Sequence, residues 1–179
     1  MTLDQIPAFD PIDLIVVAVY GLMIGMPHFK SSKALILANV FTNLMTAVYF
    51  GVAGANTGMA LCLIAGLSSL SQYFIPISDR PLIRRIRLTL GLTAGTIATA
   101  MFYEGAADLL ICAAIFSLRI SEAIASIILL RASIMMSAFA WMLYAVDHEL
   151  YWLCLAELLT FLSASYAIFR ARKPSVQPT

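Results

Sequence analysis

Apolar stretches alternate with short polar or charged segments along the whole chain. The first stretch covers Ile12 to Met26, and a stretch without any charged residue then runs from Ala34 to Ser78. The uncharged stretch is long enough for two helices of about 20 residues each. Residues that favour turns stand near its middle: Gly51, Gly54, Asn56 and Gly58. Four more apolar stretches follow: Ile86 to Tyr103, Ala106 to Ala125, Ala132 to Val146 and Leu150 to Phe169. The pattern predicts an all-α fold of seven helices.

The composition indicates that these helices cross a membrane. Of the 179 residues, 61% are hydrophobic and 12% are charged, and the mean hydropathy is +0.91. Such a chain has too few polar residues to cover the surface of a water-soluble domain. We therefore expect a polytopic membrane protein with seven transmembrane helices. No Lys or Arg precedes the first apolar stretch, so we expect this stretch to be a retained helix rather than a cleaved signal.

The charged residues separate by side when the predicted helices are threaded through a bilayer. One side receives every cation: Lys30, Lys33, Arg80, Arg84, Arg85, Arg87, Arg119, Arg131, Arg170, Arg172 and Lys173. The other side receives only acidic residues: Asp4, Asp10, Asp13, Glu104, Asp108, Asp147 and Glu149. Because positive loops stay in the cytoplasm, we expect a multi-pass protein of the bacterial inner (cytoplasmic) membrane. Its N-terminus lies outside and its C-terminus is cytoplasmic in this prediction.

The second half of the chain reads as a second copy of the first half. Lys33, Ala34, Ile36, Phe41, Ala47 and Val48 align with Arg131, Ala132, Ile134, Phe139, Ala145 and Val146. After a shorter loop, Leu61, Cys62, Leu63, Leu67, Leu70 and Ser71 align with Leu153, Cys154, Leu155, Leu159, Leu162 and Ser163. A single helix between the copies would let them run in the same direction. The sequence thus predicts one membrane domain, 1–179, with repeat one at 11–78, a linker helix at 86–103, repeat two at 106–169 and a cytoplasmic tail at 170–179.

A few polar side chains interrupt the predicted helices and are candidates for a site. Asn39, Asn43 and Thr46 share one helix face by their spacing, where they either bond a neighbouring helix or line a wet cavity. Glu157 is a carboxylate in an otherwise uncharged helical stretch, about 10 Å from its start at 1.5 Å per residue. Desolvation at that depth favours the neutral acid. We expect this acid to bond Tyr144 or a hydroxyl of the second or third helix.

Several kinds of chemistry are not supported by the sequence. Cys62, Cys112 and Cys154 are odd in number and lie in apolar stretches, which is typical of buried thiols rather than of disulfides or redox sites. The loop 147–149 combines one histidine with two carboxylates, which is too few placed ligands to predict a metal site. No nucleophile and base pair is evident, so we expect neither an enzyme nor a cofactor. Gly21 and Gly25 would allow close approach of a neighbouring helix.

The predicted plan of three helices, one helix and three helices, with the N-terminus outside, resembles the MtN3/SWEET/PQ-loop superfamily. The segment Pro27-His28-Phe29-Lys30, followed by Lys33, resembles a degenerate PQ loop in which His replaces Gln. Ala125 stands where the second repeat would carry the matching proline. The second half is more similar to the YgjV-like bacterial inner-membrane proteins, on Asp108-Leu109-Leu110, Arg131, Trp141 and Glu157.

The resemblance implies a transporter of small neutral metabolites, in which two helix bundles rock about a site near the middle of the bilayer. The expected substrate-binding residues are Asn39, Asn43, Trp141 and Glu157, and Glu157 would be able to couple a proton. The alternative is a non-transporting membrane subunit or scaffold, in which Asn39 and Glu157 bond neighbouring helices. The expected partners are the lipid bilayer and an unknown small polar solute, with a homo-oligomer left open. Nucleic acid is not expected, because the net charge is only +1.

Overall fold

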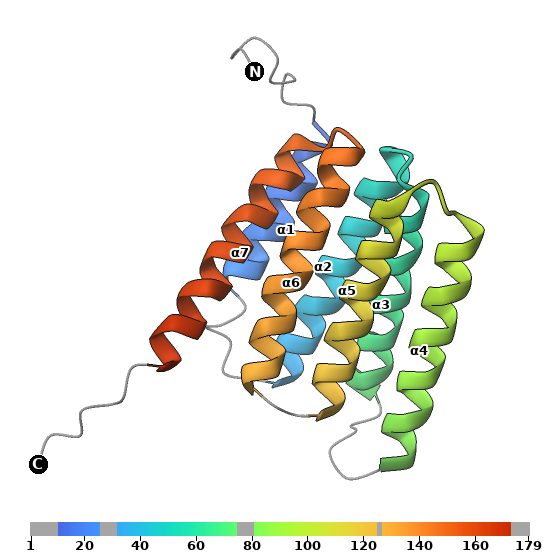
Figure 1. The fold of residues 1–179 in the computed structure, drawn as a ribbon, viewed down its shortest axis with the longest axis vertical. Coiled ribbons are helices and arrows are strands. Elements are labelled where there is room, and N and C mark those ends of the chain that lie inside the picture. The colour runs from blue at the N-terminus through green and yellow to red at the C-terminus, as the bar shows by residue number, and fades with distance from the viewer. Residues whose placement is uncertain (1–10, 26–31, 75–80, 125–126, 173–179) are drawn as a thin grey trace, which may run out of the picture.

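The computed structural model describes residues 11–25, 32–74, 81–124 and 127–172. Over these ranges the chain forms seven α-helices and no strand, which confirms the predicted all-α fold. The helices are α1 (Asp13–Gly25), α2 (Ser32–Val52), α3 (Asn56–Phe74), α4 (Pro81–Met101), α5 (Ala106–Ile124), α6 (Ile127–Asp147) and α7 (Tyr151–Arg172). Consecutive helices run in opposite directions (Figure 1). The odd-numbered helices therefore all start at the same end of the bundle.

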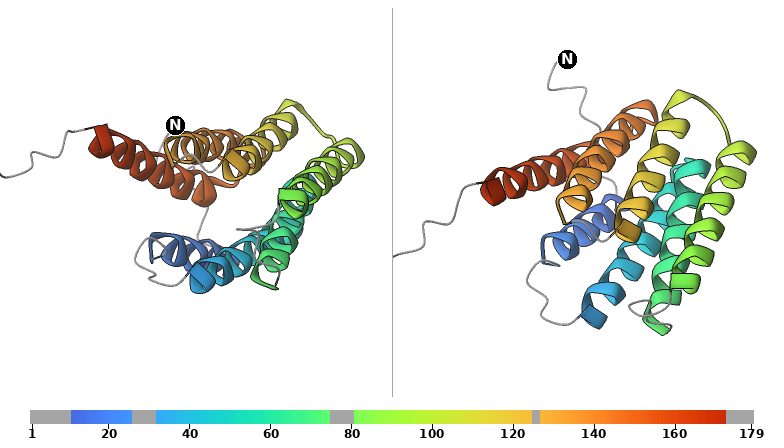
Figure 2. Two further views of the ribbon diagram at one scale, coloured as in Figure 1. Left: turned by 90° about the horizontal axis from the view of Figure 1, so that it is seen from below. Right: turned by 60° about the horizontal axis from the view of Figure 1, so that its bottom comes forward.

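The helices form two layers joined at one edge. One layer consists of α1, α2 and α3 side by side, and the other consists of α5, α6 and α7 (Figure 2). α4 packs against both α3 and α5 and covers the edge where the two layers meet. At the opposite edge, α1 contacts α7. The arrangement matches the predicted helix plan, while the internal repeat stays a prediction.

Three helix ends differ by three residues or more from those expected from the sequence, and an arginine lies near each. α4 is helical from Pro81 rather than from Ile86, and α6 is helical from Ile127 rather than from Ala132. α7 continues to Arg172, so the helix extends into the segment predicted as a tail. Arginine is a good helix former, and proline is well suited to the first helical position. These charged residues therefore lengthen the helices, whereas the sequence prediction treated them as loop residues.

The turns at one end of the bundle use fewer glycines than expected. Of the four predicted turn residues, Gly54 lies in the turn between α2 and α3 with a φ of 77°. Gly51 belongs to α2, whereas Asn56 and Gly58 belong to α3. In the turn between α6 and α7, Glu149 adopts a φ of 59°. This left-handed conformation is unfavourable for a residue with a side chain.

Charged residues separate between the two ends of the bundle. The end at which the odd-numbered helices start carries Asp13, Glu104, Asp108, Asp147 and Glu149, and we call it the acidic end. At this end the Asp108 carboxylate accepts hydrogen bonds from the backbone N–H groups of Glu104 at 2.7 Å and Gly105 at 3.1 Å. The opposite end carries Arg84, Arg85 and Arg87, in the first turns of α4. Lys30, Arg80, Lys173 and the segment that resembles a PQ loop lie outside the described residues.

The core contains side chains from both layers. Tyr20, Phe50, Leu61, Ile111 and Tyr144 are buried in one continuous cluster. The expected role of Gly21 in close helix packing is not met within the chain, since a Cβ at this position would have no atom within 4 Å. Judged by length and apolarity over the described ranges, none of the helices qualifies as a membrane span.

Candidate functional site

A hydrogen bond joins the two layers at the edge where α1 meets α7. The Tyr20 Oη atom of α1 donates to the Glu157 Oε1 atom of α7 at 2.5 Å. Tyr20 is 9% exposed and Glu157 is half-buried. The predicted partners of Glu157, Tyr144 or a hydroxyl of the second or third helix, are therefore wrong. The correct partner comes from the first helix, because α7 packs against α1.

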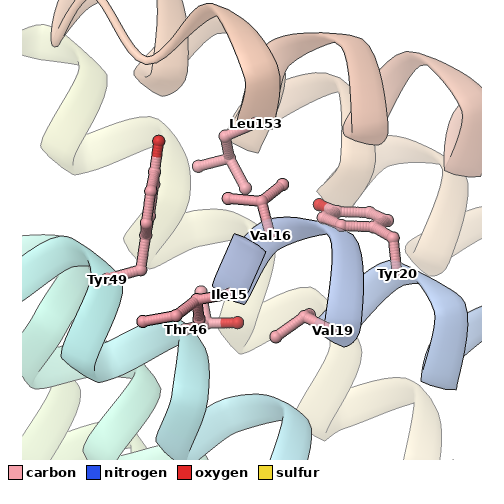
Figure 3. Close-up of a pocket in the computed structure, with 7 residues that line it drawn as sticks. All are labelled: Ile15, Val16, Val19, Tyr20, Thr46, Tyr49 and Leu153. Carbon is pink, nitrogen blue, oxygen red and sulfur yellow. The ribbon is translucent and has the colours of Figure 1, made fainter. Parts of the chain in front are cut away.

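A narrow hollow, partly open to the outside and with room for about one water molecule at most, lies beside this hydrogen bond. Its walls are Ile15, Val16, Val19 and Tyr20 of α1, Thr46 and Tyr49 of α2, and Leu153 of α7. In Figure 3, Tyr20 and Tyr49 stand on opposite sides of the hollow, with Val16 and Leu153 between them. The hollow therefore lies between the two layers, and the surface that it exposes is apolar.

A second bond between a phenol and a carboxylate lies at the other side of the hollow. The Tyr49 Oη atom donates to the Asp13 Oδ1 atom at 3.3 Å. Asp13 is the first residue of α1 and is only 6% exposed, and Tyr49 is 3% exposed. The sequence prediction counted Asp13 among the charges of the outer side and did not consider it a site residue. The hollow is thus flanked by one tyrosine–carboxylate pair on each side.

The side chains on the asparagine face of α2 form hydrogen bonds within the bundle: Asn39, Asn43 and Thr46. The Asn39 Nδ2 atom donates to Ser69 Oγ of α3 at 2.9 Å. The Asn43 Nδ2 atom donates to the backbone oxygen of Asn39 at 2.7 Å and to its Oδ1 atom at 3.0 Å. Asn39 therefore bonds α2 to α3, whereas Asn43 bonds within α2. Thr46, on the same face one turn further toward the acidic end, lines the hollow.

Trp141, the remaining predicted site residue, belongs to an aromatic cluster with Phe50 and Tyr144. Its ring stacks on Phe50 of α2 at a centroid distance of 5.2 Å and meets Tyr144 edge to face at 5.7 Å. The Tyr144 hydroxyl in turn accepts a hydrogen bond of 3.0 Å from the backbone N–H of Gly58 in α3. The cluster joins α6 to the opposite layer. Trp141 is not among the residues that line the hollow.

The four predicted site residues are therefore distributed over three places rather than gathered in one. Asn39 and Asn43 lie between α2 and α3, Trp141 lies in the aromatic cluster, and Glu157 lies beside the hollow. Tyr20, Tyr49 and Asp13 were missed by the sequence analysis. A signal for Tyr20 was present, since it carries the one hydroxyl group in the apolar sequence of α1.

One cation reaches further into the bundle than the predicted separation of charges allows. The Arg119 Nη2 atom of α5 donates to the backbone oxygen of Ala65, midway along α3, at 3.4 Å. The long arginine side chain can extend away from its own helix position while its stem stays on apolar neighbours. Arg119 therefore ties the two layers together near the edge that α4 covers.

Comparisons with known proteins gave no relative from which a role could be transferred. No protein-family model matches the chain, and no similar protein was found among the curated proteins or the solved structures.

Proposed function

We propose that the protein is a small-solute transporter of the bacterial inner membrane, which moves a small polar metabolite between its two helix layers. In this proposal it resembles the SWEET and PQ-loop plan and the YgjV-like proteins. The observation that carries the proposal is the Tyr20–Glu157 hydrogen bond, because it joins the two layers beside a hollow.

The distribution of apolar and polar side chains supports a membrane location. Each of the seven helices in the described ranges carries at least one large apolar side chain that is more than half exposed. Phe74 and Met101 are each 72% exposed. Polar side chains are buried instead, among them Asp13, Thr42 and Ser69. In water, so much exposed apolar surface would drive association. In a bilayer the same side chains would contact the apolar hydrocarbon chains of the lipids.

Glu157 is placed so that its protonation state can affect the contact between α1 and α7. A carboxylate accepts a hydrogen bond from Tyr20 in its charged form, and the neutral acid can also donate one. A change of protonation therefore changes the strength of the contact between α1 and α7. Rocking of one helix bundle against another about a central site is the usual way in which such transporters work. The proposal therefore includes a proton-linked form, in which transport of the solute is coupled to protonation of Glu157.

The size of the hollow indicates which state the structure represents. Ligand sites for small molecules generally have volumes of about 300–1,000 Å³, whereas the hollow has room for about one water molecule at most. The layers would have to separate further before a metabolite could enter. We therefore assign the structure to a closed state of the proposed cycle.

Uptake by purified protein in sealed liposomes tests the proposal. We expect at least one of a panel of radiolabelled sugars and other small neutral metabolites to accumulate above the level in empty liposomes. Glu157→Gln keeps a hydrogen-bond acceptor for Tyr20 and should retain the fold but lose any pH dependence of uptake. Asp147→Asn, which changes a carboxylate at the acidic end that does not line the hollow, is the matched control. The proposal is refuted if folded protein transports none of the panel at any pH gradient.

One observation favours the alternative of a non-transporting membrane subunit. The Asn39 amide donates to Ser69 of the neighbouring helix, as expected for a residue that holds helices together, and Asn43 donates to Asn39. For a structural role of this kind, Glu157→Gln would leave stability unchanged and Glu157→Ala would reduce it, with no uptake by any variant. The same set of variants therefore separates the two candidates.

A further inference from the structure

We propose that Asp108 and Thr99 bind a single Na⁺ ion in a buried site at the acidic end, where α4 and α5 meet α3. The proposal goes beyond transport and does not depend on it. It is carried by two buried oxygen atoms, Asp108 Oδ1 and Thr99 Oγ1, for which the described part of the chain supplies no hydrogen-bond partner. Buried polar atoms of folded proteins are generally satisfied, and a bound water or ion serves where the protein offers no partner.

The two oxygen atoms belong to the contacting sides of α4 and α5. Gly95 marks the side of α4 that faces α5, since a Cβ atom there would lie 2.9 Å from the Phe116 ring. Thr99 follows Gly95 by four residues and Asp108 precedes Phe116 by eight, so both lie on these contacting sides. Thr99 stands two residues before the end of α4, and Asp108 stands two residues after the start of α5. Because the two helices are antiparallel, the two side chains lie at the same height in the bundle.

Both side chains are enclosed by the helices around them. Asp108 is 2% exposed and Thr99 is 4% exposed. The start of α3 is tied to the end of α4 here, because the Thr57 hydroxyl donates to the backbone oxygen of Phe102 at 2.7 Å. Asp108 Oδ1 and Thr99 Oγ1 form no hydrogen bond with each other. A third group between them is therefore needed to satisfy both.

The charge of Asp108 indicates that this third group is a cation rather than a water molecule. The Oδ2 atom of Asp108 accepts hydrogen bonds from two backbone N–H groups, which are bonds of the kind that an ionised carboxylate forms. Within the described ranges, however, no Lys or Arg forms an ion pair with Asp108. A buried charge is strongly unfavourable unless a charge of opposite sign pairs with it. A water molecule would satisfy the two oxygen atoms but would leave the charge unpaired.

The surroundings of the site attract cations. Glu104 belongs to the loop that precedes α5, and Asp147 lies beside this loop, since its Oδ2 atom is 3.9 Å from the Cβ position of Gly105. Thr99 is in the last turn of α4. The last turn of a helix carries backbone carbonyl groups without intrahelical partners and the negative end of the helix dipole. Negative charge of this kind raises the local concentration of cations.

The ligand set matches Na⁺ better than a divalent or transition metal ion. One carboxylate supplies one negative charge, and the hydroxyl and carbonyl groups are neutral oxygen ligands. Ca²⁺ usually takes several carboxylates, and Zn²⁺ is bound mainly by Cys and His. Over the described residues, no group of three His, Cys, Asp or Glu side chains is placed to hold such an ion. Since both oxygen atoms are fully enclosed, the smaller Na⁺ is favoured over K⁺.

Thermal unfolding of the purified protein in detergent, followed by tryptophan fluorescence, tests the site. The salt is NaCl, KCl or choline chloride at one fixed ionic strength. We expect Na⁺ to raise Tm in a saturable way, by roughly 5–10 °C at about 100 times its Kd, and choline to have no such effect. Asp108→Asn keeps an acceptor for the two N–H groups and should abolish the effect of Na⁺. Glu149→Gln removes an exposed carboxylate from the same end and, as the matched control, should retain it.

Thr99→Val gives a second readout, because valine has the shape of threonine without the hydroxyl group. In choline chloride this variant should unfold at the same temperature as the native chain or at a higher one, since it removes an unsatisfied buried hydroxyl. In NaCl it should be less stable than the native chain, with an apparent Kd for Na⁺ about tenfold higher. The order of the two stabilities should therefore reverse with the salt.

Equilibrium binding of radioactive sodium to the same samples should give one ion per chain. Where Asp108→Asn does not fold, Thr99→Val and this binding measurement decide. Equal Tm shifts by Na⁺, K⁺ and choline, or undiminished Na⁺ binding by Asp108→Asn, would overturn the proposal. A Thr99→Val variant that is more stable than the native chain in every salt would also overturn it, since its hydroxyl would then hold no ion. None of these measurements involves a transported solute, so a failed uptake screen leaves their result standing.

Discussion

Replacement of Gly58 by alanine is expected to destabilise the protein, because the aromatic cluster occupies the space of the missing side chain. A Cβ atom at this position would lie 2.9 Å from Tyr144 Cε1 and 3.1 Å from two ring atoms of Phe50. Both rings are 0% exposed. Neither ring can move away freely, because they pack on each other at 5.6 Å and Tyr144 is tied to the Gly58 N–H.

The magnitude follows from two opposing effects. Overpacking of a filled core costs about 1–3 kcal/mol, and the close approach to two buried rings places Gly58 in the upper part of this range. Alanine gains at most about 1 kcal/mol over glycine in a helix interior. Gly58→Ala should therefore lower the free energy of unfolding by roughly 1–2 kcal/mol. Gly91→Ala meets no atom within 4 Å and should raise it by about 0.5–1 kcal/mol.

Thermal unfolding in detergent micelles, followed by the fluorescence of Trp141 and Trp152, measures the difference. For a chain of this size, 1 kcal/mol corresponds to roughly 2–4 °C in Tm, so the two variants should differ by roughly 3–12 °C. Gly51→Ala is a useful intermediate, since its Cβ would lie 2.9 Å from the flexible end of Met59. Equal stability of Gly58→Ala and Gly91→Ala would show that α6 is not packed on α3 as the structure places it.

Three further predictions address the membrane location, the topology and the asparagine face. The protein should stay with the membrane pellet after a wash in alkaline carbonate, and recovery in the supernatant would contradict a membrane location. A reporter fused after Lys173 should be cytoplasmic, and reporters inserted at Asn56 or His148 should be periplasmic; a cytoplasmic signal at His148 would be incompatible with seven spans. Asn39→Leu removes the donor to Ser69 and one of the two acceptors of the Asn43 amide and should cost about 1–3 kcal/mol in thermal unfolding, and an unchanged Tm would place the asparagines toward lipid.

The number and order of the helices could be predicted because each apolar stretch is long and ends in turn residues or charges. The ends themselves were less predictable where arginines flank a stretch. The start of α6 at Ile127 illustrates the reason. A charged residue marks the edge of an apolar stretch, but arginine does not stop a helix. The residue at which an apolar stretch ends is therefore not the residue at which its helix ends.

Single residues of the candidate site could be predicted, but the contacts between them could not. The depth of Glu157 and the shared face of Asn39 and Asn43 follow from spacing within one helix. The partner of Glu157 depends on how α7 is rotated and on which helix lies beside it, and an apolar sequence contains little information on either. Tyr20 and Glu157 are 137 residues apart in the chain. The sequence-based choice of Tyr144 failed because that side chain lies at α3, where its hydroxyl accepts from the Gly58 N–H, and not beside Glu157.

The lengths of α1 and α7 explain why the Tyr20–Glu157 bond is well placed to control the layers. α1 has 13 residues and α7 has 22, which correspond to about 20 Å and 33 Å at 1.5 Å per residue. α1 therefore packs on the half of α7 nearest the acidic end, and Tyr166 in the other half is 65% exposed. At the opposite edge the layers are joined through α4 and by Arg119. A motion that pivots at α4 would open the edge between α1 and α7 most, and the first polar contact that it breaks there is the hydrogen bond from Tyr20 to Glu157.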